Sequence, residues 1–129
     1  MYDVLDTARG ARDQSLLASI TTAGSDRAGI CYEQRTYVVK VLEGVFEDDR
    51  YFGVIYTLDD TDDWTDPAVW PKANPNYGVS VLAEDFERSA REAMNKLAAQ
   101  NNFLTKRLNV WVNADSAWMD MRAWDRCAN

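Results

Sequence analysis

The chain has 129 residues, of which 47% are hydrophobic and 27% charged, so it is long enough to form one domain with its own core. It contains no histidine, which excludes histidine-based acid–base catalysis, a Ser-His-Asp triad and most zinc chemistry within it. Its net charge of −7 argues against a general basic surface for nucleic acid, and no apolar run approaches the ~18 residues that a membrane span requires.

The N-terminal stretch predicts a helix followed by a strand. Residues 2–12 have the pattern of a helix end that stops near Gly10. Residues 16–21, LLASIT, form a short apolar run, which is typical of a strand buried in a parallel sheet. The sequence therefore predicts that the domain begins with a helix end and continues into a buried strand.

A second helix and a second strand are expected next. Ser25 or Asp26 can cap a helix over 26–43, with Gly44 as its stop. Residues 51–58, YFGVIYTL, are rich in aromatic and β-branched side chains and predict a strand. Strand, helix and strand in this order favour a right-handed crossover in an α/β sheet.

The long irregular stretch 59–80 contains an acidic run and all three prolines of the chain. Counted from Asp59, the positions at which a calcium loop needs glycine and glutamate hold Trp64 and Trp70. We therefore interpret the run as a solvated loop and predict no metal site. Asp66-Pro67 predicts a capped single helical turn.

The rest of the chain is expected to be mostly helical. The strongest amphipathic pattern covers 83–100, after which Asn101 and Asn102 interrupt it. Residues 103–112 begin as a further helix, and Ser116 can cap a last short one. The fold class expected overall is thus α/β: a partial sheet followed by a mostly helical subdomain.

Basic residues gather along this helical stretch. Lys96, Lys106 and Arg107 lie close in sequence to Phe103 and Trp111. Basic side chains interleaved with aromatic ones can contact nucleic acid, but they are more often the solvated face of an amphipathic helix. Both interpretations stay open, and the three basic residues are candidate DNA contacts.

The stretch Thr21-Thr22-Ala23-Gly24 has the composition of a strand end beside a helix start. Two hydroxyls, followed by a glycine that lets the backbone turn, are often found where a protein touches a phosphate. The alternative is a purely structural role, as a strand end followed by a helix cap. No loop of the GxxxxGK[ST] type occurs in the chain, so these residues alone cannot form an ATP site.

Three motifs in fixed order show a resemblance to a known family. They are ITTAG at 20–24, WPKANPNYG at 70–78 and FLTKRLNVW at 103–111. Together they closely resemble the large subunit of tailed-phage terminases, the DNA-packaging motor. The resemblance implies an enzyme with an N-terminal P-loop ATPase and a C-terminal nuclease of the ribonuclease-H type.

Under this resemblance, Thr21, Thr22, Ala23 and Gly24 would be the ATPase coupling motif. Residues 1–58 would be the C-terminal part of the ATPase domain, with a partial P-loop-type sheet. Residues 59–129 would form the lid and linker leading towards the nuclease. The family uses ATP and magnesium, and its partners are double-stranded DNA, the portal protein, the small terminase subunit and other large subunits.

The same resemblance implies that the nucleotide-binding residues of the ATPase and the nuclease lie outside this sequence. The phosphate loop and the Asp-Glu magnesium pair would precede Met1, and the nuclease aspartates would follow Asn129. The isolated chain is therefore expected to be inactive and to bind no cofactor. Two alternatives remain: a non-catalytic binding module that docks through the 59–80 loop and the basic helix, and an inactive prophage remnant.

The cysteine content predicts the compartment. Cys31 and Cys127 lie far apart and match no metal spacing. No secretory signal precedes them, so the simplest interpretation is a protein with reduced thiols in the cytoplasm of a bacterial host.

Overall fold

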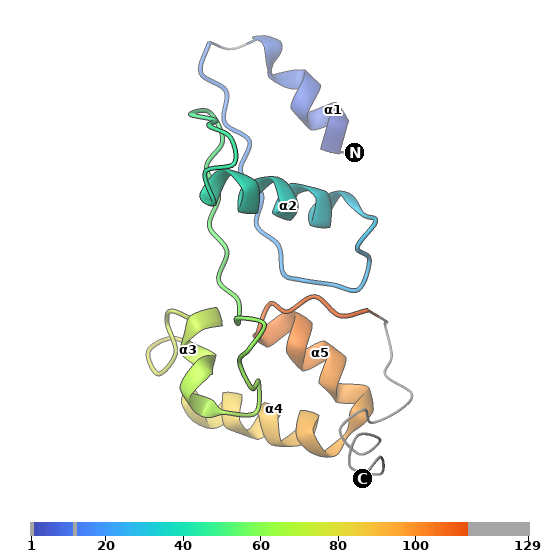
Figure 1. The fold of residues 1–129 in the computed structure, drawn as a ribbon, viewed down its shortest axis with the longest axis vertical. Helices are drawn as coiled ribbons and strands as arrows, with labels where there is room; N and C mark the ends of the chain where they lie inside the picture. The colour runs from blue at the N-terminus through green and yellow to red at the C-terminus, as the bar shows by residue number, and fades with distance from the viewer. Residues whose placement is uncertain (1, 12, 114–129) are drawn as a thin grey trace.

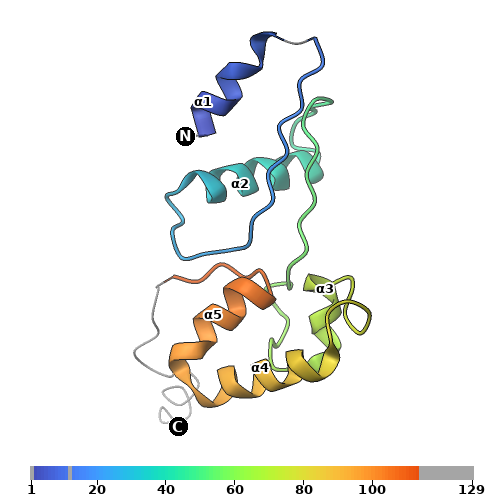
Figure 2. The same cartoon turned by 180° about the vertical axis from the view of Figure 1, so that it is seen from behind.

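The structure, a computed structural model, describes residues 2–11 and 13–113 (Figure 1). All named elements in this part are helical, and Figure 2 shows from behind that they form two groups, α1 and α2 at one end and α3 to α5 at the other. In chain order they are α1 (Tyr2–Thr7), the 3-10 turn η1 (Ala8–Ala11), α2 (Ile30–Leu42), the 3-10 turn η2 (Pro67–Val69), α3 (Trp70–Ala73), α4 (Ala83–Asn95) and α5 (Leu97–Arg107).

The expected α/β sheet is wrong for the part of the chain that the structure describes. Residues 16–21 and 51–58 run as stretched chain without strand pairing. Leu16 and Ile20 are 90% and 101% exposed, and Phe52 is 88% exposed, so the first segment is not the buried strand that its composition predicted. Apolar and β-branched side chains favour extended backbone, but a strand also needs a second backbone at hydrogen-bonding distance.

Helix α2 starts later than the predicted range 26–43. Asp26 does not cap it, because its carboxylate accepts the N–H of Ala28 at 3.0 Å in a local turn. Gly29 stands at the N-cap position without a side-chain cap, and the helix begins at Ile30. The local competition of a short carboxylate for nearby backbone explains the shift.

The end of α2 lies where the sequence predicted it. Gly44 has φ 71°, a left-handed conformation that glycine adopts without strain. The N–H of Val45 bonds to the carbonyl of Lys40 at 2.9 Å, and that of Gly44 bonds to Val41 at 3.1 Å. These paired bonds satisfy carbonyls that the last helical turn would otherwise leave open.

The stretched segment 51–57 packs against α2. A Cβ atom at Gly53 would lie 2.6 Å from both γ-carbons of Val38, so the Val38 side chain packs on the Gly53 backbone and leaves no room for a side chain there. The rings of Tyr37 and Tyr51 meet edge to face at 4.8 Å. No residue of α2 is fully buried, however, so this end of the molecule has little core.

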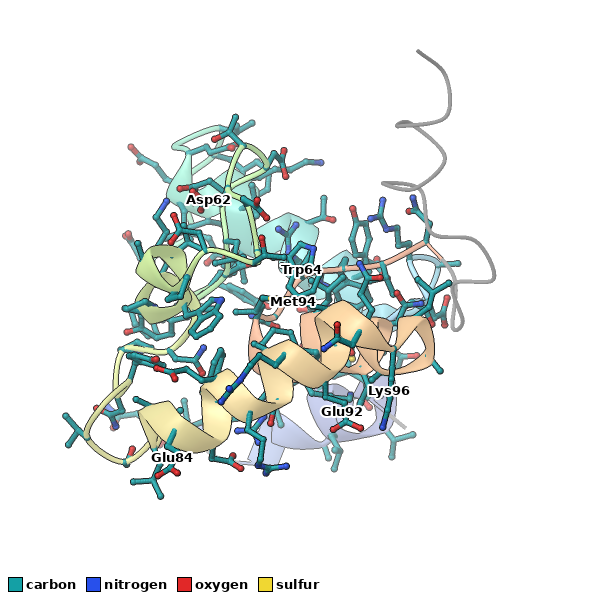
Figure 3. The ribbon with its side chains drawn as sticks, turned by 90° about the horizontal axis from the view of Figure 1, so that it is seen from below. Asp62, Trp64, Glu84, Glu92, Met94 and Lys96 are labelled. Atoms are coloured by element: carbon teal, nitrogen blue, oxygen red, sulfur yellow. The ribbon has the colours of Figure 1, made fainter. Side chains whose placement is uncertain are left out.

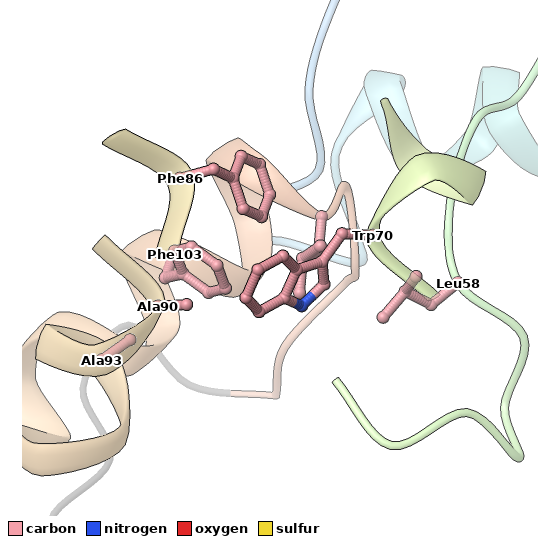
Figure 4. Close-up of a cluster of buried hydrophobic side chains, with 7 residues drawn as sticks. Leu58, Trp70, Phe86, Ala90, Ala93 and Phe103 are labelled. Atoms are coloured by element: carbon pink, nitrogen blue, oxygen red, sulfur yellow. The ribbon is translucent and has the colours of Figure 1, made fainter. Parts of the chain in front are cut away.

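The hydrophobic core lies at the other end. Figure 4 shows the indole of Trp70 between Leu58 on one side and the side chains of α4 and α5 on the other. Trp70 and Leu108 have almost no exposed area, and the indole Nε1 donates to the carbonyl of Trp64 at 2.9 Å. The buried cluster consists of Leu58, Trp70, Phe86, Ala90, Ala93, Phe103 and Leu108.

The break between α4 and α5 falls at Lys96, not at Asn101 and Asn102 as predicted. Lys96 leaves the helical region with φ −126° and ψ 107°, while both asparagines lie inside α5. The turn allows Ala93 of α4 and Phe103 of α5 to bury against the same cluster. Tertiary packing therefore outweighs the low helix propensity of asparagine.

The turn at Asp66-Pro67 is confirmed. The Asp66 carboxylate accepts the N–H of Ala68 at 2.9 Å, and Pro67 occupies the first position of η2. Among the described residues, no helix is long and apolar enough to cross a membrane. The last predicted helix, starting near Ser116, lies outside the described residues, as does Cys127.

Candidate functional site

The threonine segment 21–24 lies at the junction between the two groups of helices. Thr21 and Thr22 are exposed, whereas Ala23 is buried, with 2% of its surface accessible. The hydroxyl of Thr21 donates to the carbonyl of Thr22 at 3.2 Å. The hydroxyl of Thr22 accepts from the Lys106 ammonium at 3.3 Å. The hydroxyls are thus accessible while the backbone just behind them is held.

The chain that follows α5 holds this backbone. The N–H of Ala23 donates to Oδ1 of Asn109 at 2.7 Å. The N–H of Val112 donates to the carbonyl of Gly24 at 3.2 Å. A Cβ atom at Gly24 would lie 3.7 Å from the ring of Trp111, which is ordinary contact, so the indole lies close beside this backbone.

Trp111 also reaches the start of α2. Its ring meets that of Tyr32 edge to face, with centroids 4.9 Å apart and planes at 78°. The Arg27 guanidinium donates to the carbonyl of Trp111 at 3.1 Å. The residues between the threonines and α2, and α2 itself, therefore contact the same short segment after α5.

The three basic candidates for DNA contact have different surroundings. Lys96 pairs with Glu92 at 2.9 Å, and Figure 3 shows the two side chains together near the end of α4, away from Glu84. Arg107 pairs with Asp85 at 2.9 Å. Lys106 bonds to Thr22 as described. Lys96, the N-cap of α5, and Arg107, its last residue, are about 16 Å apart along the helix axis, and each of these two charges has a carboxylate partner.

The pKa of Asp85 reflects two guanidinium groups. Its carboxylate accepts from Arg88, three residues along α4, and from Arg107 of α5. These hydrogen bonds, that from Arg88 first, hold the pKa of Asp85 below its usual value. The carboxylate thereby ties α4 to α5 at their outer surface.

The acidic loop packs against a lysine of α3. The Lys72 ammonium contacts Asp59 at 2.6 Å and Asp62 at 2.8 Å. Hydrogen bonding to Asp59 and then Asp62 raises the pKa of Lys72, and the bond from Lys72 lowers the pKa of Asp62. Figure 3 shows Asp62 in the loop beside Trp64.

Magnesium, which the family resemblance implies, does not fit this loop. The ion needs oxygen ligands that can face it, and the ammonium of Lys72 takes that position. In the ranges 2–11 and 13–113, no three acidic or cysteine side chains are grouped so that they could hold a metal ion. We assign no metal-dependent step to these residues.

Sequence reasoning missed Asn109. The residue has φ 55° and touches both the threonine segment and the stretch 51–57. An asparagine directly after the basic last turn of a predicted helix is a recognised signal for a left-handed helix end. That signal could have located the end of α5, but not the side-chain partners of the asparagine.

Comparisons with known proteins point in one direction. A family model described as the endonuclease domain of the terminase large subunit matches residues 45–129. Protein YmfN of Escherichia coli (strain K12) is 45% identical over 127 residues, which cover 98% of this chain. The chain spans 28% of the length of that relative. No solved structure matches the chain.

Proposed function

The chain belongs to the terminase large subunit family, and on this premise we propose that it is the connecting part of a DNA-packaging motor. In this proposal, the threonine segment 21–24 is the coupling motif of the ATPase. Residues 1–58 end the ATPase domain and 59–129 form the lid and linker. The matched range, whose model is named for the endonuclease domain, begins at residue 45 and so includes all of the proposed linker.

The observation that carries the proposal is the pair of hydrogen bonds between the threonine segment and the chain that follows α5, one to the side chain of Asn109 and one to the backbone of Val112. Ala23 and Gly24 bond to Asn109 and Val112 at 2.7 and 3.2 Å. Thr21 and Thr22 are exposed. A hydroxyl can donate or accept, so it suits a contact with a phosphate or water that changes during hydrolysis. A shift of this segment would displace the chain after α5.

The cofactor and partners of the proposed motor follow from the family. ATP and magnesium would be bound by other parts of a large subunit, because this sequence has no phosphate loop. Double-stranded DNA, the portal protein, the small terminase subunit and other large subunits would be the partners, in the cytoplasm of a bacterial host. The chain by itself is then expected to hydrolyse no ATP.

The test uses a packaging-competent family member with threonines at the aligned positions. We expect Thr21→Val and Thr22→Val, made at those positions, to keep nucleotide binding and to lose DNA-stimulated turnover. Thr36→Val, at a threonine inside α2 whose hydroxyl bonds to the carbonyl of Tyr32, is the matched control. Normal packaging by both test variants would remove the coupling role.

A binding module remains the competing function, and DNA binding separates the two. With a net charge of −7 and ion pairs at Lys96 and Arg107, we expect no detectable duplex binding by the isolated chain at ~0.15 M salt. A micromolar complex with steep salt dependence, lost in Lys106→Glu/Arg107→Glu, would favour the binding module over the motor part.

A further inference from the structure

Asn109 ends α5 in a conformation that few residues adopt. Its φ is 55°, and among the described residues other than glycine it is the only one with a positive φ. Asparagine tolerates this left-handed region better than most side chains. The reversal brings the N–H of Val110 back to the carbonyl of Leu104 at 2.9 Å, directly after Leu108, which is fully buried. The position of Asn109 is therefore set by the core.

The amide group of Asn109 joins two distant segments. Oδ1 accepts the N–H of Ala23 at 2.7 Å across 86 residues of sequence. Nδ2 donates to the carbonyl of Tyr56 at 2.8 Å across 53 residues. A backbone N–H can only donate and a carbonyl can only accept, so these partners determine which way the amide is oriented.

The backbone of Asn109 adds a third contact. Its carbonyl accepts the hydroxyl of Thr57 at 2.9 Å. Ala23 is 2% exposed, so removal of the asparagine amide would leave a buried donor unsatisfied, which is unfavourable and promotes local opening. Asn109, at the edge of the core, thus holds both stretched segments at their C-terminal ends, near Ala23 and near Tyr56.

We propose that Asn109 is a positioning residue for the coupling segment. This proposal rests on the proposed function, under which residues 21–24 respond to the nucleotide. The amide fixes the distance between Ala23 and the end of α5, so a displacement of the threonines is transmitted to α5 and to Tyr56. Asn109 lies within the FLTKRLNVW motif at 103–111, outside the threonine segment 21–24, and in this role it touches neither nucleotide nor DNA.

The structural part is tested on this chain by amide hydrogen exchange. Asn109→Gly retains a residue that adopts positive φ but removes both side-chain bonds. We expect exchange at the Ala23 N–H to become about tenfold faster, while exchange at Val110 stays within about twofold. Asn102→Ala, at an exposed asparagine of α5, should leave Ala23 unchanged. Unchanged exchange at Ala23 in Asn109→Gly would overturn the proposal.

A conservative variant separates positioning from general stability. Asn109→Asp keeps an oxygen for the Ala23 N–H and loses the donor to Tyr56. Exchange at Ala23 should then stay nearer to the original protein than to Asn109→Gly. Equal acceleration in both variants would show that the acceptor is not what holds Ala23, and would also overturn the proposal.

The functional part is tested in a packaging-competent family member with asparagine at the aligned position. Substitution by glycine should leave nucleotide binding and unstimulated hydrolysis unchanged and raise the ATP consumed per packaged base pair about tenfold. If the threonine variants lose stimulated turnover but the glycine variant packages normally, the positioning role is wrong and the proposed function stands. If both package normally, both are wrong.

Discussion

The two ends of the molecule are built on different principles. The region 58–112 has a contiguous buried cluster around Trp70. Among the described residues of the region 2–57, Ala23 alone belongs to the buried hydrophobic set, and large apolar side chains such as Phe52, at 88%, are exposed. It is held instead by local contacts around α2 and by bonds to the chain after α5. The candidate coupling segment is therefore positioned by the region 58–112, which has the core, rather than by a core of its own.

The largest expected effect tests the core. Trp70→Ala should lower the free energy of unfolding by about 3–5 kcal/mol, because it removes a fully buried aromatic side chain and its indole hydrogen bond. Denaturant titration of both variants measures this. Phe52→Ala, at an exposed ring, should change stability by no more than about 0.5 kcal/mol. Equal losses in the two variants would break the contrast between the regions.

A smaller effect is expected where α2 meets the stretched chain. Gly53→Ala would place its Cβ 2.6 Å from the γ-carbons of Val38, and such overpacking costs about 1–3 kcal/mol. Amide exchange of α2 should accelerate while that of α4 does not. Adding Val38→Ala should restore protection by providing space. Gly10→Ala, where nothing lies within 4 Å, serves as control; a loss there as large as at Gly53 would contradict the packing explanation.

The aromatic contact between the regions is expected to contribute less. In a double-mutant cycle of Trp111→Ala and Tyr32→Leu, the coupling energy should be about 0.5–1.5 kcal/mol, the usual value for an edge-to-face pair. Thermal or chemical unfolding of the four proteins gives this value. Strictly additive losses would mean that the rings at 4.9 Å do not hold α2 to the segment after α5.

The smallest expected effect is on thermal stability at low pH. The pKa of Asp85 is lowered in the folded chain, first by Arg88 and then by Arg107. Its stabilising contribution is therefore complete above the unfolded pKa of about 3.9 and is lost as pH falls through the lower folded pKa. Melting temperatures measured downward from pH 5 should fall less steeply for Asp85→Asn than for the original protein or for Glu84→Gln. Identical slopes would show that this carboxylate does not link α4 to α5.

Much of the local structure could be predicted. The stop at Gly44, the turn at Asp66-Pro67 and the start of an amphipathic helix at residue 83 all occur as the sequence indicated. The late start of α2 at Ile30 and the break between helices at Lys96 were not predicted. The first difference follows from the local bond between Asp26 and Ala28. The second follows from the packing of Ala93 and Phe103 in one buried cluster.

The candidate site was predicted in part. The threonine segment was identified from its motif, and the structure places it beside Lys106, one of the basic residues picked out for DNA. Whether these residues act in coupling or in DNA contact stays a prediction. Asn109 was missed because an asparagine in a basic helix end has many possible roles, and its partners lie 53 and 86 residues away.

The sequence by itself determined features that depend on one or two turns of chain: caps, stops, the apolar stripe of α4 and membership of the terminase family through its motifs. Tertiary structure alone decided whether residues 16–21 and 51–58 would pair into a sheet, and which side chain would hold Ala23. The physical reason is range. A helix satisfies its hydrogen bonds within itself, whereas stretched chain must find partners elsewhere. Here Asn109, at the edge of the core, bonds to both stretched segments, and Val112 and Lys106 bond to the first of them.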